Sequence, residues 1–148
     1  MANMNQFKSE YQNIVDQNTP KNNVWSDSIK AFLIGGLICI IGQAFIDIYM
    51  YFGLAFEESA TLSTITLILI SAILTAFNVY DNIGKVGGAG ALIPITGFAN
   101  SMVASAMEYK KEGFIYGMGA KLFTIAGPVI VYGTIASVVI GIIYYFVK

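Results

Sequence analysis

The sequence contains no histidine and no arginine, and its only cysteine is Cys39. A disulfide within the chain, a cysteine or histidine metal site and a histidine-based catalytic pair are therefore excluded by counting. Charged residues make up only 11% of the chain, against about a quarter in a typical soluble domain. The net charge of -1 provides no basic field for a nucleic acid. We expect no nucleic-acid partner and no metal or other cofactor.

Hydrophobic residues, in contrast, make up 56% of the chain, and they gather in long runs. The runs at residues 29–52, 61–80 and 122–147 are each long enough to cross a hydrocarbon core of about 30 Å at about 1.5 Å per helical residue. The sequence predicts an all-α integral membrane protein with three to four transmembrane helices. We divide it into a polar leader, residues 1–28, and a membrane domain, residues 29–148.

The leader contains a short amphipathic pattern. Its apolar residues recur at helical spacing until Pro20 ends the pattern. These residues are Met4, Phe7, Tyr11, Ile14 and Val15. Two interpretations stay open: the helix rests on the membrane headgroups, or it docks a partner protein.

A further apolar segment, residues 86–107, is interrupted by glycine and proline. Pro94 lacks an N–H and clashes with the preceding helical turn, and the glycines on both sides of it weaken a helix further. Backbone groups freed by such a break find no hydrogen-bond partner in lipid, so the break survives only inside protein or beside a wet cavity. We therefore expect a broken segment that adjoins a cavity or a tight protein interface.

The lysines bear on how this segment lies in the membrane, because lysines in short loops favour the cytoplasmic side. If the segment crosses fully, Lys110, Lys111 and Lys121 fall on the side opposite to the other five lysines. If it dips in and returns, seven lysines share one side and only Lys148 lies opposite. The charges favour the re-entrant arrangement, while the apolar length of the segment keeps the crossing arrangement open.

The residues after Pro94 predict a half-helix whose amino end lies within the membrane. Thr96 is placed to cap it, and Asn100 follows one turn later on the same face. Unpaired N–H groups and the helix dipole give such an end a partial positive charge, which attracts carboxylates. An anionic solute is the predicted guest. The alternative is a proline-kinked helix that packs against its neighbours and holds no ligand.

Polar residues on the neighbouring spans extend the candidate site, because the first two spans each carry a polar stripe at helical spacing. Two candidates have a second interpretation: Asp47 as a solvated residue at the membrane boundary, and Lys121 as a side chain that snorkels to the headgroups. The candidate pore or anion-binding residues are Gly88, Gly90, Pro94, Thr96, Gly97, Asn100, Gln43, Asp47, Ser71, Thr75, Asn78 and Lys121.

Two stretches, "IKAFLIGGLICIIGQ" and "GGAGALIPITGFANSMVASAMEYKKEGFIYGMGAKLFTIAGPVIVYG", resemble the SpoVAC/SpoVAEb membrane proteins of endospore-forming bacteria. The resemblance extends from Ile29 to the carboxyl terminus, and its most specific part is the core "GAGALIPITGF". The family motif maps without departure onto Gly88, Gly90, Pro94, Thr96, Gly97 and Asn100.

This resemblance implies a component of the spore inner-membrane complex that moves dipicolinic acid, with calcium, into the forming spore and out at germination. It also implies a hetero-oligomer with other SpoVA-type membrane and soluble subunits. Dipicolinate is a small planar dianion, which agrees with a half-helix end that attracts carboxylates. Whether calcium travels bound to the dianion stays open.

Two rival functions also stay open. A tension-gated channel would open when membrane stretch favours a wider state, and a scaffold would anchor a soluble partner through residues 1–28 without lining a pore. An enzyme is not predicted, because no histidine and no Ser/Lys pair at one membrane level supplies an activated nucleophile.

Overall fold

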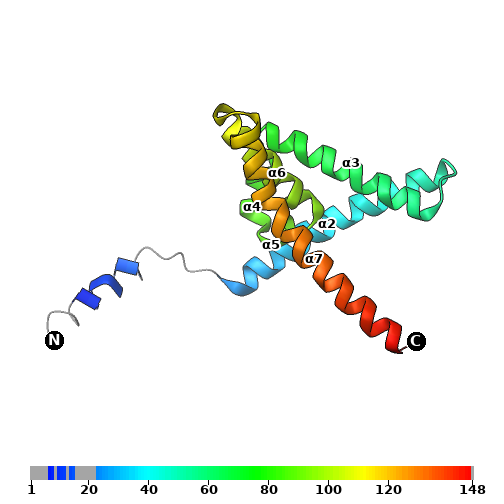
Figure 1. The fold of residues 1–148 in the computed structure, drawn as a ribbon, viewed down its shortest axis with the longest axis horizontal. Helices are drawn as coiled ribbons and strands as arrows, with labels where there is room; N and C mark the ends of the chain where they lie inside the picture. Colours follow the sequence, from blue (N-terminus) through cyan, green and yellow to red (C-terminus); the bar gives the residue numbers. More distant parts are fainter. Residues whose placement is uncertain (1–6, 9, 13, 16–22, 148) are drawn as a thin grey trace.

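The computed structural model of the chain describes residues 7, 8, 10–12, 14, 15 and 23–147. Every regular element among them is helical, and Figure 1 shows their arrangement. The elements are α2 (Val24–Tyr51), α3 (Phe56–Ala76), α4 (Tyr80–Gly87), α5 (Ala89–Leu92), α6 (Ile95–Glu108), a 3-10 turn (Tyr109–Glu112), a π-helical turn (Phe114–Gly119) and α7 (Ala120–Val147). The stretches long and apolar enough to cross a membrane are Val24–Tyr51, Phe56–Ala76 and Phe114–Val147. The predicted all-α class with membrane-spanning helices is thereby confirmed.

The helix ends differ from the ends of the apolar runs, because a helix can continue outside lipid and can stop before an apolar run does. α2 begins at Val24, and Asp27 in its first turn suits the positive end of the helix dipole. α3 ends at Ala76, since Asn78 just beyond takes a left-handed conformation with φ of 57°.

In the leader, the described residues between 7 and 15 are helical, while Met4 and Pro20 of the predicted amphipathic pattern lie outside the described residues.

The contact between α2 and α3 is built from small and polar side chains, as is usual where helices meet inside a membrane. Gly42 of α2 is buried, and the Ser63 hydroxyl of α3 donates a 2.8 Å hydrogen bond to its carbonyl oxygen. The hydroxyls of Tyr49 and Thr66 lie 2.7 Å apart. In the described part of the chain, the buried hydrophobic side chains are Tyr80, Ala91 and Ala99. Close backbone approach and hydrogen bonds therefore hold this core more than large apolar side chains do.

The segment at residues 86–107 is not one continuous helix. Gly88 separates α4 from α5 with φ of 49°, a conformation that glycine adopts without strain. Pro94 separates α5 from α6 and is itself the N-cap of α6, with φ of -59°. The expectation that Thr96 caps this helix is wrong, because Pro94 already starts the turn and places Thr96 inside it.

The short helix α5 packs on α2 through glycine. A Cβ atom at Gly90 would lie 1.9 Å from the carbonyl oxygen of Ala31, and a Cβ atom at Gly35 would lie 3.2 Å from the carbonyl oxygen of Gly90. Backbone atoms cannot yield as side-chain ends do. Glycine at position 90 is therefore a requirement of this helix contact.

The helix α6 lies along α3 and runs in the same direction. Ser71 of α3 contacts Thr96 at the start of α6, and Thr75, one turn later, contacts Asn100, also one turn later. In Figure 1, α4 and α5 lead away from the end of α3, and α6 leads back to it. The broken segment thus forms a helical hairpin against α2 and α3.

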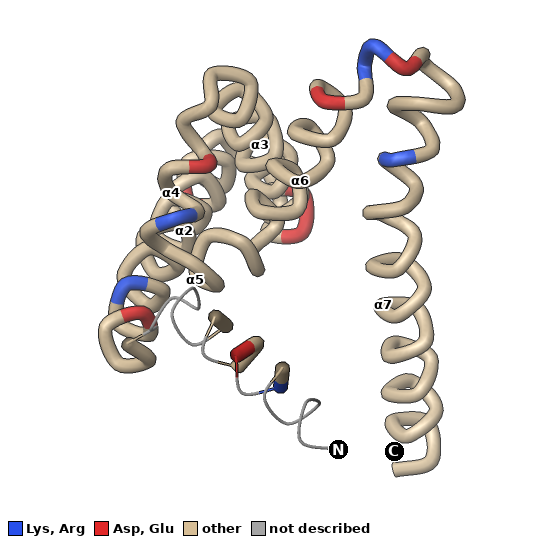
Figure 2. Tube along the Cα trace, turned by 90° about the vertical axis from the view of Figure 1, so that its left-hand side faces the viewer, with Lys and Arg blue, Asp and Glu red and all other residues tan. Residues whose placement is uncertain are grey.

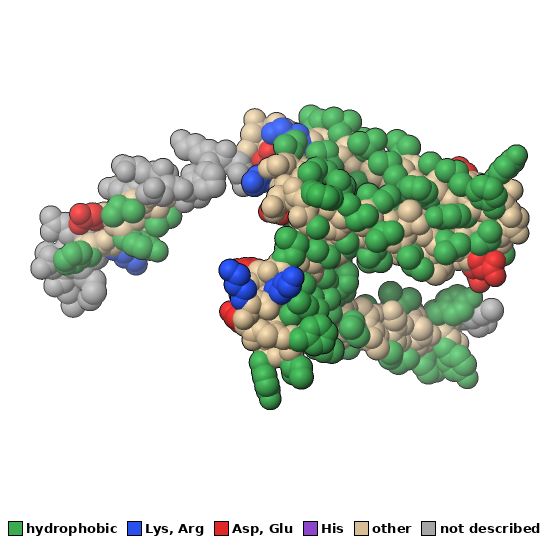
Figure 3. Space-filling view, turned by 90° about the horizontal axis from the view of Figure 1, so that it is seen from above, with side chains coloured by type: hydrophobic (Ala, Val, Ile, Leu, Met, Phe, Trp, Pro, Cys, Tyr) green, Lys and Arg blue, Asp and Glu red, His purple; other side chains and the backbone are tan. Residues whose placement is uncertain are grey.

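The last helix, α7, stands beside the body formed by α2 to α6 (Figure 2) and contacts α6 and the π-helical turn. It contains Pro128, and none of its residues is buried. Figure 3 shows the large hydrophobic side chains spread over the surface of the body and of α7. Such a surface suits contact with lipid or with other membrane helices.

Candidate functional site

Five side chains from α3, α4 and α6 form a hydrogen-bonded group, here called the polar cluster: Ser71, Thr75, Tyr80, Thr96 and Asn100. The Tyr80 hydroxyl lies 2.8 Å from the Ala91 carbonyl oxygen and 2.7 Å from Thr96 Oγ1. A tyrosine hydroxyl has one hydrogen, so if it donates to the carbonyl, the Thr96 hydroxyl donates to Tyr80. One side chain thus joins α4 to both helices that follow it.

The rest of the polar cluster joins α6 to α3. The Ser71 hydroxyl donates a 2.5 Å hydrogen bond to the Thr96 carbonyl oxygen. Thr75 Oγ1 lies 2.7 Å from the Ser71 carbonyl oxygen and 2.8 Å from the Asn100 side-chain amide. The cluster therefore connects the three helices α3, α4 and α6 through hydrogen bonds that each involve at least one of its side chains.

All five members of the polar cluster are buried, with at most 8% of any residue exposed. Hydrogen bonds at such a position are strengthened by the low local dielectric, and leaving one partner unpaired is costly. The hydroxyls of Thr96 and Ser71 are consequently engaged with protein, not free for a solute. The groups left to bind a solute at the amino end of α6 are the backbone N–H groups of its first turn, because helical geometry gives them no intrahelical acceptor.

Tyr80 is the member of the polar cluster that sequence reasoning missed. The sequence places it at the end of an apolar run, where an aromatic residue suggests an anchor at the headgroups. Its hydroxyl instead points into the protein, and only 3% of the residue is exposed. The one available signal is its position directly before the polar pair Asp81 and Asn82, which ends the apolar run; in the structure a new helix, α4, begins at Tyr80 itself.

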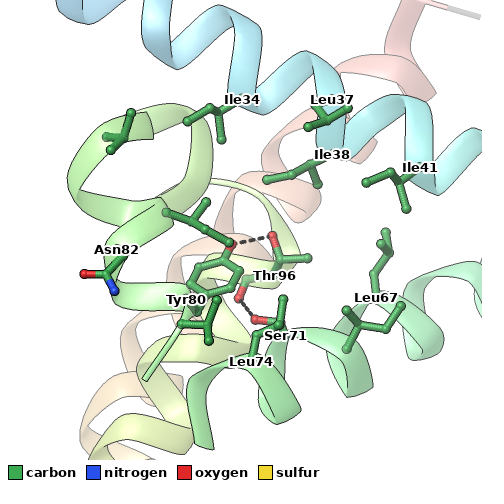
Figure 4. A pocket seen from close by; sticks show the side chains of 14 residues that line it. Ile34, Leu37, Ile38, Ile41, Leu67, Ser71, Leu74, Tyr80, Asn82 and Thr96 are labelled. Atoms are coloured by element: carbon green, nitrogen blue, oxygen red, sulfur yellow. Dashed lines mark hydrogen bonds between the residues drawn. The ribbon is translucent and has the colours of Figure 1, made fainter. Parts of the chain in front are cut away.

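A cavity of about 520 Å³ adjoins the polar cluster between α2, α3 and α4. Figure 4 shows aliphatic side chains from α2 directed toward Tyr80 and Thr96. Apart from Ser71, Tyr80, Asn82 and Thr96, the lining is aliphatic: Ile34, Leu37, Ile38, Ile41, Leu67, Ile70, Leu74, Val79, Ile83 and Val86. The helix break therefore does adjoin a hollow, but an apolar one.

A second, more polar pocket of about 310 Å³ lies where the hairpin meets the end of α3. It is lined by Thr75, Asn78, Asp81, Ala104, Met107 and Glu108. Asp81 belongs to the first turn of α4 and Glu108 is the last residue of α6, so the two ends of the hairpin share one pocket. We call this pocket the hairpin mouth.

The other candidate residues lie apart from the polar cluster or act through the backbone. Gln43 donates a 2.8 Å hydrogen bond to Asp47 on the exposed face of α2. Lys121, on α7, places its Nζ 4.5 Å from the centre of the Tyr109 ring, a cation–π contact. The structure therefore brings Ser71, Thr75, Thr96 and Asn100 together and leaves these two polar positions of α2 and the lysine of α7 outside.

The motif glycines and the proline shape the site without lining it. A Cβ atom at Gly97 would lie 2.3 Å from the Leu92 carbonyl oxygen, so the turn around Pro94 needs glycine there. Gly88 and Gly90 set the turn and the helix contact described above. Within the described residues, no group of three or more histidine, cysteine, aspartate or glutamate side chains is arranged to hold a metal ion.

Comparison with known proteins gives the family. A profile of the SpoVAC/SpoVAEB sporulation membrane proteins matches residues 27–143. Stage V sporulation protein AC of Bacillus subtilis (strain 168) is 46% identical over 143 residues, which cover 96% of this chain and 95% of that protein. No solved structure matches the chain. The matched region includes the hairpin, the polar cluster and both pockets, and the chain belongs to the SpoVAC/SpoVAEB family of sporulation membrane proteins.

Proposed function

We propose that this chain is a subunit of a spore inner-membrane conduit for dipicolinic acid and that its helical hairpin forms part of the path. The observation that carries the proposal is the interrupted backbone at Gly88 and Pro94, held by the buried polar cluster in a hairpin whose two ends share the polar hairpin mouth. Non-helical backbone at membrane depth persists where it is buried in protein or lines a water-filled cavity, and many transporters form their substrate sites at such breaks. The family resemblance supplies the solute.

The re-entrant arrangement of the hairpin is part of this proposal. It is supported by the parallel course of α3 and α6 and by the hairpin mouth, where Asp81 and Glu108 line one pocket. A segment that crossed the membrane would place its two ends on opposite sides. The lysine distribution favours the same arrangement.

The charges at the hairpin mouth bear on the form of the solute. Asp81 and Glu108 would repel a free dianion, whereas the calcium chelate of dipicolinate carries no net charge. Carboxylate oxygens are also the ligands that calcium prefers. We therefore infer that dipicolinate passes this point together with calcium.

The polar cluster corresponds to a closed state in this proposal. Its hydroxyls are hydrogen-bonded within the protein, so a solute reaches the amino end of α6 only after α6 and α3 separate. Membrane tension or contact with another subunit would favour such a separation if the open state occupies more area. A hetero-oligomer is also expected, since α7 has no buried residue and three spans enclose little space.

A flux measurement tests the proposal. The chain is reconstituted with its companion subunits in liposomes loaded with dipicolinate, with or without calcium, and release is followed by luminescence of the terbium chelate. Ala104→Leu, which narrows the hairpin mouth, should lower release at least several-fold, while Ala44→Leu on the exposed face of α2 should leave it unchanged. Release that Ala104→Leu leaves untouched, or that is fastest without calcium, would contradict the account.

The scaffold remains the second candidate, because one observation favours it. Phe7 and Tyr11 in the helical part of the leader are 67% and 68% exposed, as a docking helix requires. Replacing both by serine separates the two functions. If the double variant no longer recruits its partner but releases dipicolinate normally, the leader has a docking role beside the conduit. If the double variant loses sporulation function and liposomes with the wild-type protein release no dipicolinate, the scaffold alone is supported.

A further inference from the structure

The apolar cavity beside the polar cluster is open to the surroundings of the protein. Of its lining residues, Leu37, Ile41 and Val86 are 57%, 41% and 57% exposed. Its volume of about 520 Å³ lies within the usual range of small-molecule sites, roughly 300–1,000 Å³. The cavity is therefore a site that something from outside the chain can enter.

Water is a poor occupant of this cavity. The hydroxyls of Tyr80, Thr96 and Ser71 at its inner side are already hydrogen-bonded to protein, and most other lining side chains are aliphatic. A buried water needs two to four polar partners, and the engaged hydroxyls at the inner side of the cavity do not offer them. An empty space of this size would also forfeit dispersion contacts. A hydrocarbon chain is the occupant that satisfies both conditions, and the membrane supplies it.

Charge at the edge of the cavity indicates what the hydrocarbon chain is attached to. Lys85 of α4 precedes the lining residue Val86 directly, and its Nζ lies 3.5 Å from the side-chain oxygen of the lining residue Asn82. Across the described residues, the one ion pair joins Lys30 to Asp27 at 3.6 Å, so Lys85 has no carboxylate partner there. Figure 2 shows the blue segments of α2 and α4 on the same side of the body.

We propose that this cavity binds one acyl chain of an anionic phospholipid whose phosphate lies against Lys85. Asn82 lies between the lysine and the apolar lining and can donate to the glycerol or phosphate oxygens. The site holds the space between α2, α3 and α4 filled while the hairpin is closed. It does not depend on solute transport, because the argument uses only the cavity, its edge and the membrane around it.

Photo-crosslinking tests the site on the full chain. The protein is placed in nanodiscs of phosphatidylcholine that contain a trace of phosphatidylglycerol with a diazirine at the end of its acyl chain, and labelled residues are mapped by mass spectrometry. We expect residues such as Ile38 and Leu74 to be labelled at least several-fold more than the lipid-facing residues of α7. Equal labelling of the cavity and α7 would overturn the proposal.

Matched variants test the binding of the acyl chain and the binding of the headgroup separately. Ile38→Phe, which fills the cavity, should lower cavity labelling several-fold, while Ile40→Phe on the exposed face of α2 should not. Lys85→Gln should lower the preference for the glycerol over the choline headgroup about fivefold, as expected for one lysine at an anionic surface, and Lys85→Arg should keep it.

Three outcomes would contradict the phospholipid assignment. A photoreactive free fatty acid that labels the cavity as strongly as the phospholipid does, with no effect of Lys85→Gln, would show an unselective hydrocarbon site. Cross-links from the cavity to another peptide would show that a protein segment fills it. Unchanged labelling in Ile38→Phe would show that the acyl chain lies outside the cavity.

Discussion

Tyr80 is the residue on which the hairpin depends most, because its single hydroxyl joins α4 to a carbonyl of α5 and to a side chain of α6. The ring fills space that phenylalanine would fill equally well. The hydroxyl alone is what distinguishes the two residues at this position. Its contribution can therefore be measured without creating a cavity.

Tyr80→Phe should loosen the hairpin. Removing the hydroxyl leaves the buried carbonyl oxygen of Ala91 without this partner, at a cost of about 1–3 kcal/mol. We expect a lower unfolding temperature in detergent and faster hydrogen exchange at the amides of residues 95–100. Tyr116→Phe is the control, since Tyr116 is 90% exposed. Equal exchange in the two variants would show that the hydroxyl does not hold α6.

At the residue scale, the sequence predicts which polar residues belong to the site, but it predicts their hydrogen-bond partners less well. Helical spacing singled out Ser71 and Thr75, and the break singled out Thr96 and Asn100, and these four do meet. Spacing along a chain does not reveal partners on other helices. The hydroxyls expected to face a solute therefore prove to be paired with one another.

At the scale of secondary-structure elements, the hairpin is defined by where backbone approaches backbone. α5 has only four residues, and it packs mainly against α2. Gly90 makes this possible by removing the side chain that would meet Ala31. The glycine-rich motif is thus a packing requirement as well as a helix breaker.

Gly90→Ala should displace α5 from α2. The added Cβ would lie 1.9 Å from the Ala31 carbonyl oxygen, and overpacking of this kind costs about 1–3 kcal/mol. We expect a lower yield of folded protein and a lower unfolding temperature. Gly36→Ala on α2 is the control, because its Cβ would meet nothing within 4 Å. A Gly90→Ala protein as stable as Gly36→Ala would contradict the packing of α5.

Local rules explain why the break could be predicted and its cap could not. Pro94 and Gly88 act through their own backbone geometry, which is visible in the sequence. The N-cap depends on which residue first leaves the preceding turn, and there Pro94 takes precedence over Thr96. The docking of α5 on α2 depends on Ala31 and Gly35, which lie more than fifty residues earlier in the chain and which no local pattern specifies.

At the scale of the whole molecule, the chain has a compact part and a peripheral helix, α7. The hairpin, α2 and α3 enclose the polar cluster and the apolar cavity, whereas α7 contacts α6 and the π-helical turn and has no buried residue. Hydropathy predicts the spans from length and composition, and it carries no information about which of them pack together. The expectation that the chain acts within an assembly rests on this exposed helix.

The most direct test of the account is a reversible lock on the polar cluster. Thr75 and Asn100 touch across α3 and α6, so Thr75→Cys with Asn100→Cys, in a Cys39→Ser background, allows a disulfide to join the helices. Each single variant under the same oxidant is the control. The account predicts that oxidation stops calcium dipicolinate release from liposomes carrying the chain and its companions, and that a reductant restores it. Release that continues at the same rate through the cross-linked protein would contradict it.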